Sequence, residues 1–497
     1  MSINSVFSRV FSGRRDCLRK TSRGSREISR NRGQQSIARQ AEQLEPRLAL
    51  TKTVGPFVND TTKVSPGYTL FGNSFSPSTH LIDTSGQRVQ TWTGSGGQTS
   101  SYLLPNGNLL RNTNKPAGRV FGSNGSTGVI EELAWDSSVV WTFEMQTEKY
   151  QLHHDAIPMP NGNILAMAWE RHSYDEAVAM GRDPSRTNPA TNREVWSEAI
   201  FEIQPDRTDG VGGEIVWEWH LSDHLVQNKF PGKENYGSIL RQPQLVNFNY
   251  VPTGIGADTH IADWAHFNAI AYNPNTDQIA VSSREFSEIW TIDHSTTTEQ
   301  AAGHTGGRYG KGGDLLWRYG NTASWNLGTR ANQQLYFQHN VQWIADGSPG
   351  AGNILVFNNG WNRASGGSYS SVMELKPVRY GVAQRVWTYA ANPPARFFAP
   401  IVSGAQRLPN GNTLIDEGTT GRIFEVTRAG RIVWQYVNPD TMTGPLKQGV
   451  QPPLRAVTGL NGTPNVRTNM VFRAVRYAPS FEGLTGKTLT PRGTIEK

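Results

Sequence analysis

The stretch Ala429-Gly430-Arg431-Ile432-Val433-Trp434 places a tight turn before two apolar residues and a tryptophan, near the end of a β-type run. Similar runs that close on Trp recur at intervals of roughly 50 to 100 residues. Repetition at such intervals is typical of a repeat architecture, and we count one run for each blade of a β-propeller. The other five runs are Val89-Gln90-Thr91-Trp92, Val139-Val140-Trp141, Ile215-Val216-Trp217, Leu315-Leu316-Trp317 and Arg385-Val386-Trp387.

A second repeated phrase, Pro-Asn-Gly-Asn, marks hairpins. Asn-Gly strongly favours a tight hairpin because both residues tolerate positive φ. Each copy stands between one strand-like run and an apolar one, so we expect it to join the first two strands of a blade. The three copies are Pro105-Asn106-Gly107-Asn108, Pro160-Asn161-Gly162-Asn163 and Pro409-Asn410-Gly411-Asn412.

The two phrases together predict blades of four strands, with the hairpin after the innermost strand and the Trp on the outermost. The Trp side chain is expected to pack between neighbouring sheets. Residues 469–477 look like an inner strand without partners after it, and residues 67–92 look like outer strands without an inner strand before them. We therefore predict an all-β, six-bladed β-propeller of four-stranded antiparallel blades, whose ring is closed by N- and C-terminal strands in one blade.

Charge is unevenly distributed along the chain. The net charge of +7 resides in residues 1–50, which hold eleven basic and four acidic residues, while the rest of the chain is balanced. The composition gives no support for a nucleic-acid partner, which would need a basic face on the folded body. No apolar run is long enough for a membrane span, and the single cysteine, Cys17, excludes an internal disulfide in the body.

The predicted organisation has three parts. Residues 1–55 form a basic, disordered or targeting tail, residues 60–485 the propeller, and residues 486–497 a C-terminal tail. The tail lacks the apolar stretch of a standard signal peptide, but Leu44-Glu45-Pro46-Arg47 resembles a motif of planctomycete proteins thought to be exported. We expect a periplasmic or secreted location; a basic tail without a targeting role is the alternative. Some of three polar insertions, residues 170–193, 221–259 and 294–313, are expected to line a binding site.

Histidines gather on the predicted inner strands of three consecutive blades. His153 and His154 begin one strand, His266 lies in the next blade and His339 in the one after, at similar registers. Arg284 ends the strand that follows His266. Equivalent inner-strand positions face one central funnel, so these side chains are expected to meet there. A guanidinium with imidazoles suits a sulfate or phosphate group, and an imidazole can also act as a nucleophile.

Other interpretations of these residues remain open. Zinc could bring three histidines together, but the neighbouring arginine argues against a cation. Asp155 and Asp263 are expected to form turns or orient histidines rather than to act as acids or bases. Adjacent strand residues face opposite sides, and the register does not decide between His153 and His154. Structural roles are expected for the histidines in insertions and outer strands, namely His172, His220, His224, His260, His294 and His304.

The order of these motifs resembles the bacterial arylsulfotransferase family. The motifs are His153-His154-Asp155 before a Pro-Asn-Gly-Asn turn, Asp263-Trp264-Ala265-His266-Phe267-Asn268, Ser282-Ser283-Arg284 and Gln338-His339, and the match spans roughly residues 60–480. The resemblance implies a six-bladed propeller that transfers a sulfuryl group from a phenolic sulfate ester to a phenol. It implies a ping-pong reaction through a sulfohistidine, without a cofactor or metal.

The resemblance also implies roles for single residues. His339 would be the nucleophile, and His266, Arg284 and one of His153 and His154 would bind the sulfuryl oxygens. The expected partners are a small phenolic sulfate donor and a phenol acceptor; the oligomeric state is left open. The alternatives are a non-catalytic exported propeller that binds an anion, and another propeller enzyme of sulfatase-like or quinoprotein-like type. A quinone cofactor would need a calcium site built from carboxylates, whereas the predicted inner strands offer histidines.

Overall fold

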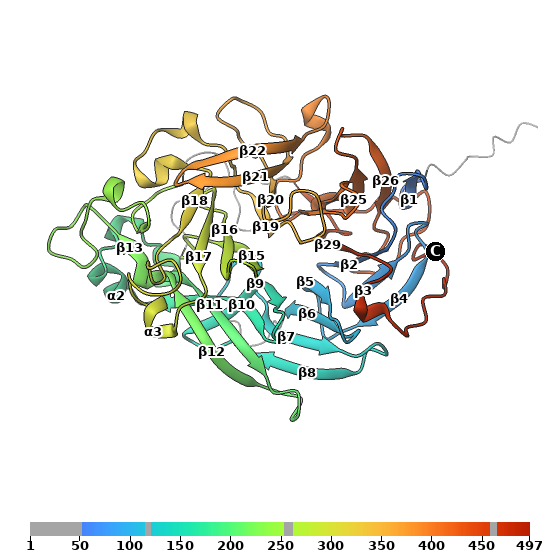
Figure 1. The fold of residues 1–497 in the computed structure, drawn as a ribbon, viewed down its shortest axis with the longest axis horizontal. Coiled ribbons are helices and arrows are strands. Elements are labelled where there is room, and N and C mark those ends of the chain that lie inside the picture. Colours follow the sequence, from blue (N-terminus) through green and yellow to red (C-terminus); the bar gives the residue numbers. More distant parts are fainter. Residues whose placement is uncertain (1–51, 115–120, 253–261, 458–464) are drawn as a thin grey trace, which may run out of the picture. The chain divides into compact units, whose positions relative to one another are not determined.

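The computed structural model describes residues 52–114, 121–252, 262–457 and 465–497. The predicted tail up to residue 51, with Cys17 and the Leu-Glu-Pro-Arg motif, lies outside them, as does His260. The described part, residues 52–497 as one unit, contains six four-stranded antiparallel sheets, one of which gains a fifth strand. The predicted six-bladed propeller is confirmed (Figure 1).

The strands of each blade follow, from the innermost outward. Blade 1 contains β29 (Val471–Tyr477), β2 (Tyr68–Asn73), β3 (Ser78–Ile82) and β4 (Arg88–Thr93). Blade 2 contains β5 (Gln98–Leu103), β6 (Leu109–Asn114), β7 (Gly128–Leu133) and β8 (Val139–Glu144). Blade 3 contains β9 (Tyr150–Pro158), β10 (Ile164–His172), β11 (Val195–Pro205) and β12 (Gly213–His220).

The second half of the ring repeats this order. Blade 4 contains β15 (Phe267–Asn273), β16 (Gln278–Ser283), β17 (Glu288–Asp293) and β18 (Trp317–Tyr319). Blade 5 contains β19 (His339–Trp343), β20 (Ile354–Asn358), β21 (Ser371–Arg379) and β22 (Val382–Tyr389). Blade 6 contains β23 (Gly404–Arg407), β24 (Thr413–Glu417), β25 (Arg422–Val426) and β26 (Ile432–Val437), with β1 (Gly55–Asn59) added beside β26.

Short elements lie in the connections between these strands. The helices are α2 (Tyr174–Ala179) and α3 (Thr298–Ala301), and two small sheets pair β13 (Leu225–Val226) with β14 (Val246–Asn247) and β27 (Leu454–Arg455) with β28 (Val466–Arg467). The 3₁₀ segments are Pro184–Arg186, Pro189–Thr191, Leu221–His224, Ile239–Arg241, Thr322–Trp325, Arg330–Asn332, Pro394–Arg396, Gly418–Thr420 and Glu482–Leu484. No helix among the described residues is both long and apolar enough to cross a membrane.

Blade 1 closes the ring as the sequence predicts. The C-terminal strand β29 pairs with β2 in antiparallel register, from Tyr477 opposite Tyr68 to Val471 opposite Asn73. β29 supplies the inner edge of this blade (Figure 1). The last residues also hold the outer strand of the blade, since the amide of Arg88 donates to the carbonyl of Gly493. Joining the two ends in one sheet leaves the ring without an open seam.

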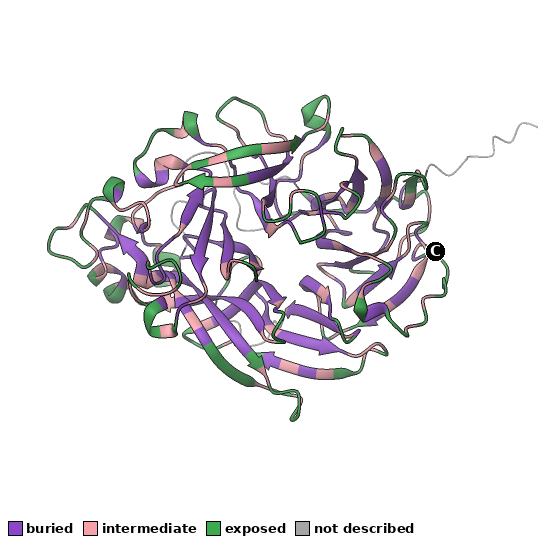
Figure 2. Cartoon of the chain, viewed as in Figure 1, coloured by how far each residue is buried: buried purple, intermediate pink, exposed green. Residues whose placement is uncertain are grey.

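The hydrophobic core lies between the blades. Six clusters of buried side chains each span two neighbouring sheets, and one example joins Leu165 and Met167 of blade 3 to Ile279 and Val281 of blade 4. Each sheet therefore buries both faces against its neighbours, as a closed ring requires. Exposed residues concentrate on outer strands such as β12 and β22, while the inner strands are buried (Figure 2).

The repeated tryptophans lie on the fourth strand of each blade, as predicted. In five blades the indole N–H also donates a hydrogen bond to the next blade, either at the connection between its third and fourth strands or at the first residue of the fourth strand. For example, Nε1 of Trp141 lies 2.7 Å from the carbonyl oxygen of Gly212. The other four pairs are Trp217–Thr296, Trp317–Val382, Trp387–Arg428 and Trp434–Thr84.

The Asn-Gly hairpins join first and second strands, as predicted, and the asparagine after each glycine has a further role. Its amide donates to a buried glutamate on the third strand; Nδ2 of Asn163, for example, lies 2.6 Å from Oε1 of Glu202. The other oxygen of Glu202 lies 2.9 Å from Nε2 of His294 in the next blade. Glu132 and Glu425 likewise each accept a hydrogen bond from the asparagine of their own hairpin and pair with a basic side chain of the next blade. The hairpins are thus tied to the contacts between blades.

Candidate active site

A cavity of about 370 Å³ lies where the inner strands converge. Its lining draws on every blade, for example Phe472 of blade 1 and Thr99 of blade 2, which places it on the axis of the ring. Four of the five predicted site residues line it: His154, His266, Arg284 and His339. The imidazoles come from three consecutive blades. The fifth residue, His153, is fully buried and does not line the cavity.

Irregular backbone directs these side chains to the axis. The pairing of β9 with β10 shifts register around His153 and His154, and the pairing of β19 with β20 shifts directly after His339. His154 and His266 both have φ of +50°, a left-handed conformation that costs a non-glycine residue about 1–3 kcal/mol. Bulges of this kind reorient a side chain out of the regular alternation, and here they turn the imidazoles toward the axis.

Hydrogen bonds fix the tautomer of His339. Its Nδ1 lies 2.8 Å from Oδ1 of Asn359 and 3.2 Å from the carbonyl oxygen of Phe337. The amide nitrogen of Asn359 donates to the carbonyl oxygens of Ala399 and Val402, so its oxygen must be the atom that faces His339. Both neighbours of Nδ1 are acceptors, and Nδ1 therefore carries the hydrogen. The lone pair of the neutral ring is on Nε2.

His339 is held in the neutral form. Burial and the positive charge of Arg284 lower the pKa of His339 to about 3. The ring is therefore unprotonated at any ordinary pH. A neutral imidazole with a defined lone pair is the form that attacks an electrophile.

Arg284 brings a fixed positive charge to the cavity. Its side chain is almost fully buried, one guanidinium nitrogen bonds to Glu285, and the ring of Phe337 lies 4.7 Å from the guanidinium carbon. Its Nη2 has no hydrogen-bond partner among the described residues. A buried donor without a partner is costly unless a ligand supplies an acceptor. The arrangement therefore favours an anion in the cavity.

His266 is paired with a buried carboxylate. Its Nδ1 lies 2.6 Å from Oδ2 of Asp263, and the side chains of Trp169 and Ser123 also donate to Asp263. Burial lowers the pKa of His266, but the charge and hydrogen bond of Asp263 outweigh it, so the net shift is upward. His266 is thus a second positively charged group when protonated, with Nδ1 committed to Asp263.

His154 is connected to two groups behind the cavity. Its Nδ1 lies 2.9 Å from Nδ1 of His153, and Nε2 of His153 lies 2.9 Å from Oε2 of Glu198 on β11. The ring centroids of His154 and His266 are 4.7 Å apart, so the two imidazoles are neighbours. Gly125 makes room for the ring, because a Cβ at this position would lie 2.1 Å from Nε2 of His154.

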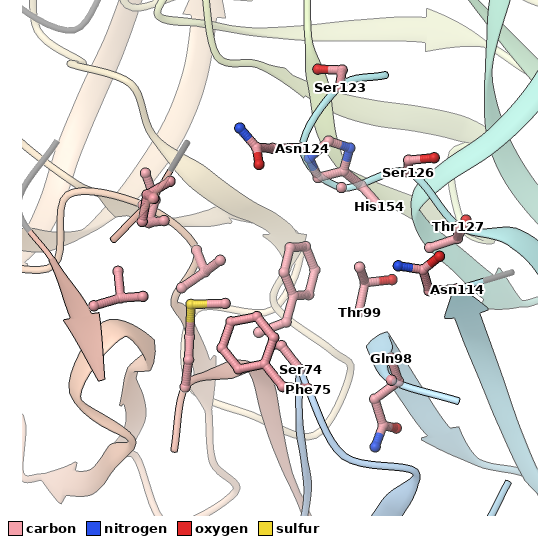
Figure 3. A pocket seen from close by; sticks show the side chains of 18 of the residues that line it. Ser74, Phe75, Gln98, Thr99, Asn114, Ser123, Asn124, Ser126, Thr127 and His154 are labelled. Atoms are coloured by element: carbon pink, nitrogen blue, oxygen red, sulfur yellow. The ribbon is translucent and has the colours of Figure 1, made fainter. Parts of the chain in front are cut away.

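The cavity has a polar and an apolar part. Thr99, Asn114 and Ser126 gather on the same side as His154 (Figure 3). Another part is lined by a cluster of buried apolar side chains that Phe75 also packs against, and these are Ile401, Val402, Val466, Met470 and Phe472. The chemistry of the lining therefore suits a ligand with an anionic group and an apolar body.

Comparison with known proteins assigns the chain to a family. The family model described as arylsulfotransferase (ASST) matches residues 74–442, which include all the residues that we predicted for the site. The chain belongs to the arylsulfotransferase family. This family member is 22% identical over 304 residues to arylsulfate sulfotransferase AssT from Escherichia coli O6:H1, an alignment that covers 55% of the chain and 46% of AssT. The chain thus spans about half the length of this curated relative.

Solved structures also share similarity with this arylsulfotransferase family member. A protein of unknown function from Bacteroides caccae is 14% identical with a TM-score of 0.42, over 75% of the chain and 94% of that protein. A putative 6-phosphogluconolactonase from Bacteroides fragilis is 11% identical with a TM-score of 0.39, over 84% and 99% of the two chains. Similarity at this level says nothing about the chemistry of the site.

Two sequence-based expectations about the site are wrong. The described residues of the insertions 170–193, 221–259 and 294–313 contribute nothing to the cavity lining, which instead uses short connections near the axis such as residues 123–127 and 401–402. Asp155 does not orient a histidine, because its carboxylate accepts from Tyr102 and pairs with Arg473. Asp263, by contrast, does orient His266, as predicted.

The described residues contain one group that has the geometry to hold a metal ion, and it lies outside the cavity. It comprises His224, His304 and Asp314, where Oδ1 of Asp314 lies 2.9 Å from Nδ1 of His224 and 2.8 Å from Nδ1 of His304. Nε2 of His224 lies 2.8 Å from the carbonyl oxygen of Ala301. Hydrogen bonds alone account for this cluster. His172, His220 and His294 likewise pair with carboxylates outside the cavity.

Two residues of the site are absent from the sequence prediction. Asn359 follows an apolar strand in Phe357-Asn358-Asn359, but nothing in that phrase marks its contact with His339. Glu198 lies in the middle of β11, where it resembles any other strand glutamate. Both act across strands or blades, and the only sequence signal is a polar residue within an otherwise buried run.

Proposed function

We propose that the chain transfers a sulfuryl group from a phenolic sulfate ester to a phenolic acceptor, through a covalent intermediate on His339. The observation that carries the proposal is the tautomer of His339, which leaves a lone pair on Nε2 in a cavity that also holds the unpartnered Nη2 of Arg284. Family membership supports the same chemistry.

The charges of the cavity suit a sulfate ester. The described lining includes Arg284 and His266 but no carboxylate. Glu285 pairs with one guanidinium nitrogen of Arg284, and burial raises the pKa of this carboxyl while the charge of Arg284 lowers it. Fixed positive groups stabilise the oxygens on which charge develops while sulfur passes between two nucleophiles. The apolar side chains around Phe472 offer a surface for the aromatic ring.

The reaction consists of two transfers at sulfur. In the first, Nε2 of His339 forms a bond to sulfur while the bond between sulfur and the phenolic oxygen breaks, and the electron pair stays on that oxygen. In the second, the oxygen of the acceptor attacks sulfur, and the bond to Nε2 breaks. The hydrogen stays on Nδ1 of His339 throughout, and its hydrogen bond to Oδ1 of Asn359 keeps the ring oriented between the two steps.

A transfer assay tests the proposal. The protein is incubated with p-nitrophenyl sulfate, with and without phenol. Release of nitrophenol that requires phenol, together with formation of phenyl sulfate, is the expected result. Release without phenol would indicate a sulfatase, and no release would indicate a non-catalytic anion-binding propeller. The His339→Ala variant is expected to lose at least about 1000-fold in rate, whereas His304→Ala, at an exposed histidine outside the cavity, keeps the wild-type rate.

A further inference from the structure

Glu198, His153 and His154 form an unbranched line of hydrogen bonds that ends at the cavity. The line starts at Oε2 of Glu198, passes through both nitrogens of His153 and enters His154 at Nδ1, with 2.9 Å at each step. Glu198 and His153 are fully buried, and His154 is nearly so. His153 also stacks on Trp169, with ring centroids 4.4 Å apart. The second nitrogen of His154, Nε2, is the atom left for the cavity.

While both rings are neutral, the contact between the two Nδ1 atoms allows only two arrangements of protons. A hydrogen bond needs one donor and one acceptor, so one ring carries hydrogen on Nδ1 and the other does not. If Glu198 is ionised, His153 donates to it from Nε2, His154 donates to His153, and Nε2 of His154 presents a lone pair. If Glu198 is protonated, each bond reverses, and Nε2 of His154 presents an N–H. The two arrangements differ by one proton.

The surroundings of Glu198 favour the protonated arrangement at rest. Its other oxygen, Oε1, accepts from the backbone N–H of Phe267 at 2.7 Å, so the proton belongs on Oε2. Burial and the nearby charge of Asp263 raise the pKa of Glu198 well above its ordinary range, although the hydrogen bond from Phe267 and the charge of His266 act in the opposite direction. Burial lowers the pKa of both His153 and His154, which keeps both rings neutral.

We propose that Glu198 stores the proton that the departing phenol requires, and that His153 and His154 carry it to the cavity. This inference depends on the proposed sulfuryl transfer. Glu198 and His153 are positioning residues in this scheme, because they act through His154 and do not line the cavity.

The protons balance over both half-reactions. As the first phenolic oxygen leaves sulfur, it takes the proton from Nε2 of His154. Nδ1 of His154 then receives the proton of His153, and Nε2 of His153 receives the proton of Glu198, which becomes a carboxylate. In the second half-reaction the acceptor phenol gives its proton to Nε2 of His154 as its oxygen attacks sulfur. Each transfer then reverses, and Glu198 is protonated again.

The Glu198→Gln variant separates this role from a structural one. Glutamine has nearly the same shape and keeps a hydrogen bond to His153, but it cannot release or take up the proton. The donors are p-nitrophenyl sulfate, whose leaving group is a weak base, and phenyl sulfate, whose leaving group is a strong base and needs the proton. In single turnovers without acceptor, we expect the rate of phenol release from phenyl sulfate to fall about 100-fold and the rate of nitrophenol release from p-nitrophenyl sulfate to fall far less.

Two further variants complete the test. Glu202→Gln makes the same change on the same strand outside the cavity and is expected to affect both donors equally. His153→Phe keeps an aromatic ring against Trp169 but interrupts the line of hydrogen bonds, so it is expected to reproduce the difference between donors.

The outcomes separate the inference from the proposed function. If wild-type protein transfers sulfuryl groups but Glu198→Gln and His153→Phe each slow the two donors by the same factor, the proton store does not exist. If wild-type protein transfers nothing, the proposed function itself is wrong. Should neither variant fold, the wild-type donor series decides, because a steep dependence on leaving-group acidity contradicts the inference.

Discussion

Asn359 decides which nitrogen of His339 is available for chemistry. Its amide group is held by two backbone carbonyls, Ala399 and Val402, and cannot turn over without losing both bonds. The neutral amide also leaves the pKa of His339 low, whereas a carboxylate in the same place would favour the charged imidazolium. At the scale of single residues, the site thus depends on a neutral acceptor next to the predicted nucleophile.

Replacing this acceptor by a carboxylate gives a prediction about pH. In Asn359→Asp, the negative charge beside Nδ1 raises the pKa of His339 from about 3. His339 reacts only when Nε2 is unprotonated, so the acid limb of the profile of kcat/KM against pH moves to higher pH. Steady-state rates with p-nitrophenyl sulfate and phenol measure the shift. Asn410→Asp, the same change in an exposed hairpin, is expected to leave the profile in place. An acid limb at the wild-type position in Asn359→Asp would contradict this account of the tautomer.

The sequence predicts the residues with strong chemical character and not their supports. Histidines at one register in three consecutive blades, with an arginine beside them, stand out, and four of the five predicted residues do line one cavity. The choice between His153 and His154 depends on the bulge in β9, which shifts the alternation of side chains locally. Asn359 and Glu198 reach their partners across strands and blades, a relation that no local pattern contains.

At the scale of strands, neighbouring blades are joined by a repeated contact. The Trp of the fourth strand buries a large aromatic surface and, in five blades, donates a hydrogen bond to the next blade. The exception is Trp92, whose Nε1 has no partner among the described residues; its ring instead packs edge-on against Trp135, with centroids 5.1 Å apart. The Trp residues that indicate the number of blades in the sequence therefore also stabilise the contacts between neighbouring blades.

This exception provides a stability prediction with its own control. Trp141→Phe removes a hydrogen bond of 2.7 Å between blades, whereas Trp92→Phe removes a similar aromatic area without a hydrogen bond. Trp141→Phe is expected to cost about 1 kcal/mol more in free energy of unfolding. Urea denaturation followed by tryptophan fluorescence gives both midpoints. Equal midpoints would show that the hydrogen bond adds nothing to the packing.

The sequence pattern of the strands predicts the architecture better than the sequence of the connections predicts their role. Alternating runs, Asn-Gly turns and Trp positions identify the blades because each reflects a local requirement of a twisted sheet. The role of a long connection depends on which end of a strand it leaves and on what lies beside it in the ring. The insertion between β17 and β18, for example, packs around α3 and the His224–Asp314 pair instead of the axis.

At the scale of the whole molecule, ring closure brings distant residues together. β29, near the C-terminus, pairs with β2, and Arg473 of β29 then meets Asp155 of β9 next to the site. Six apolar interfaces hold the blades in order around the axis. A closed ring of this kind keeps Arg284 and three imidazoles at fixed separations, so the positive charge of the cavity is organised before any substrate binds.

The most direct test of the central claim is to look for the sulfuryl group on the enzyme. A donor labelled with radioactive sulfur is mixed with excess protein without acceptor, and the protein is then digested under alkaline conditions, since a sulfur–nitrogen bond to histidine is labile in acid. The account predicts one labelled peptide that contains His339, and loss of the label when phenol is added. A label on another residue, or transfer to phenol without any label on the protein, would contradict it.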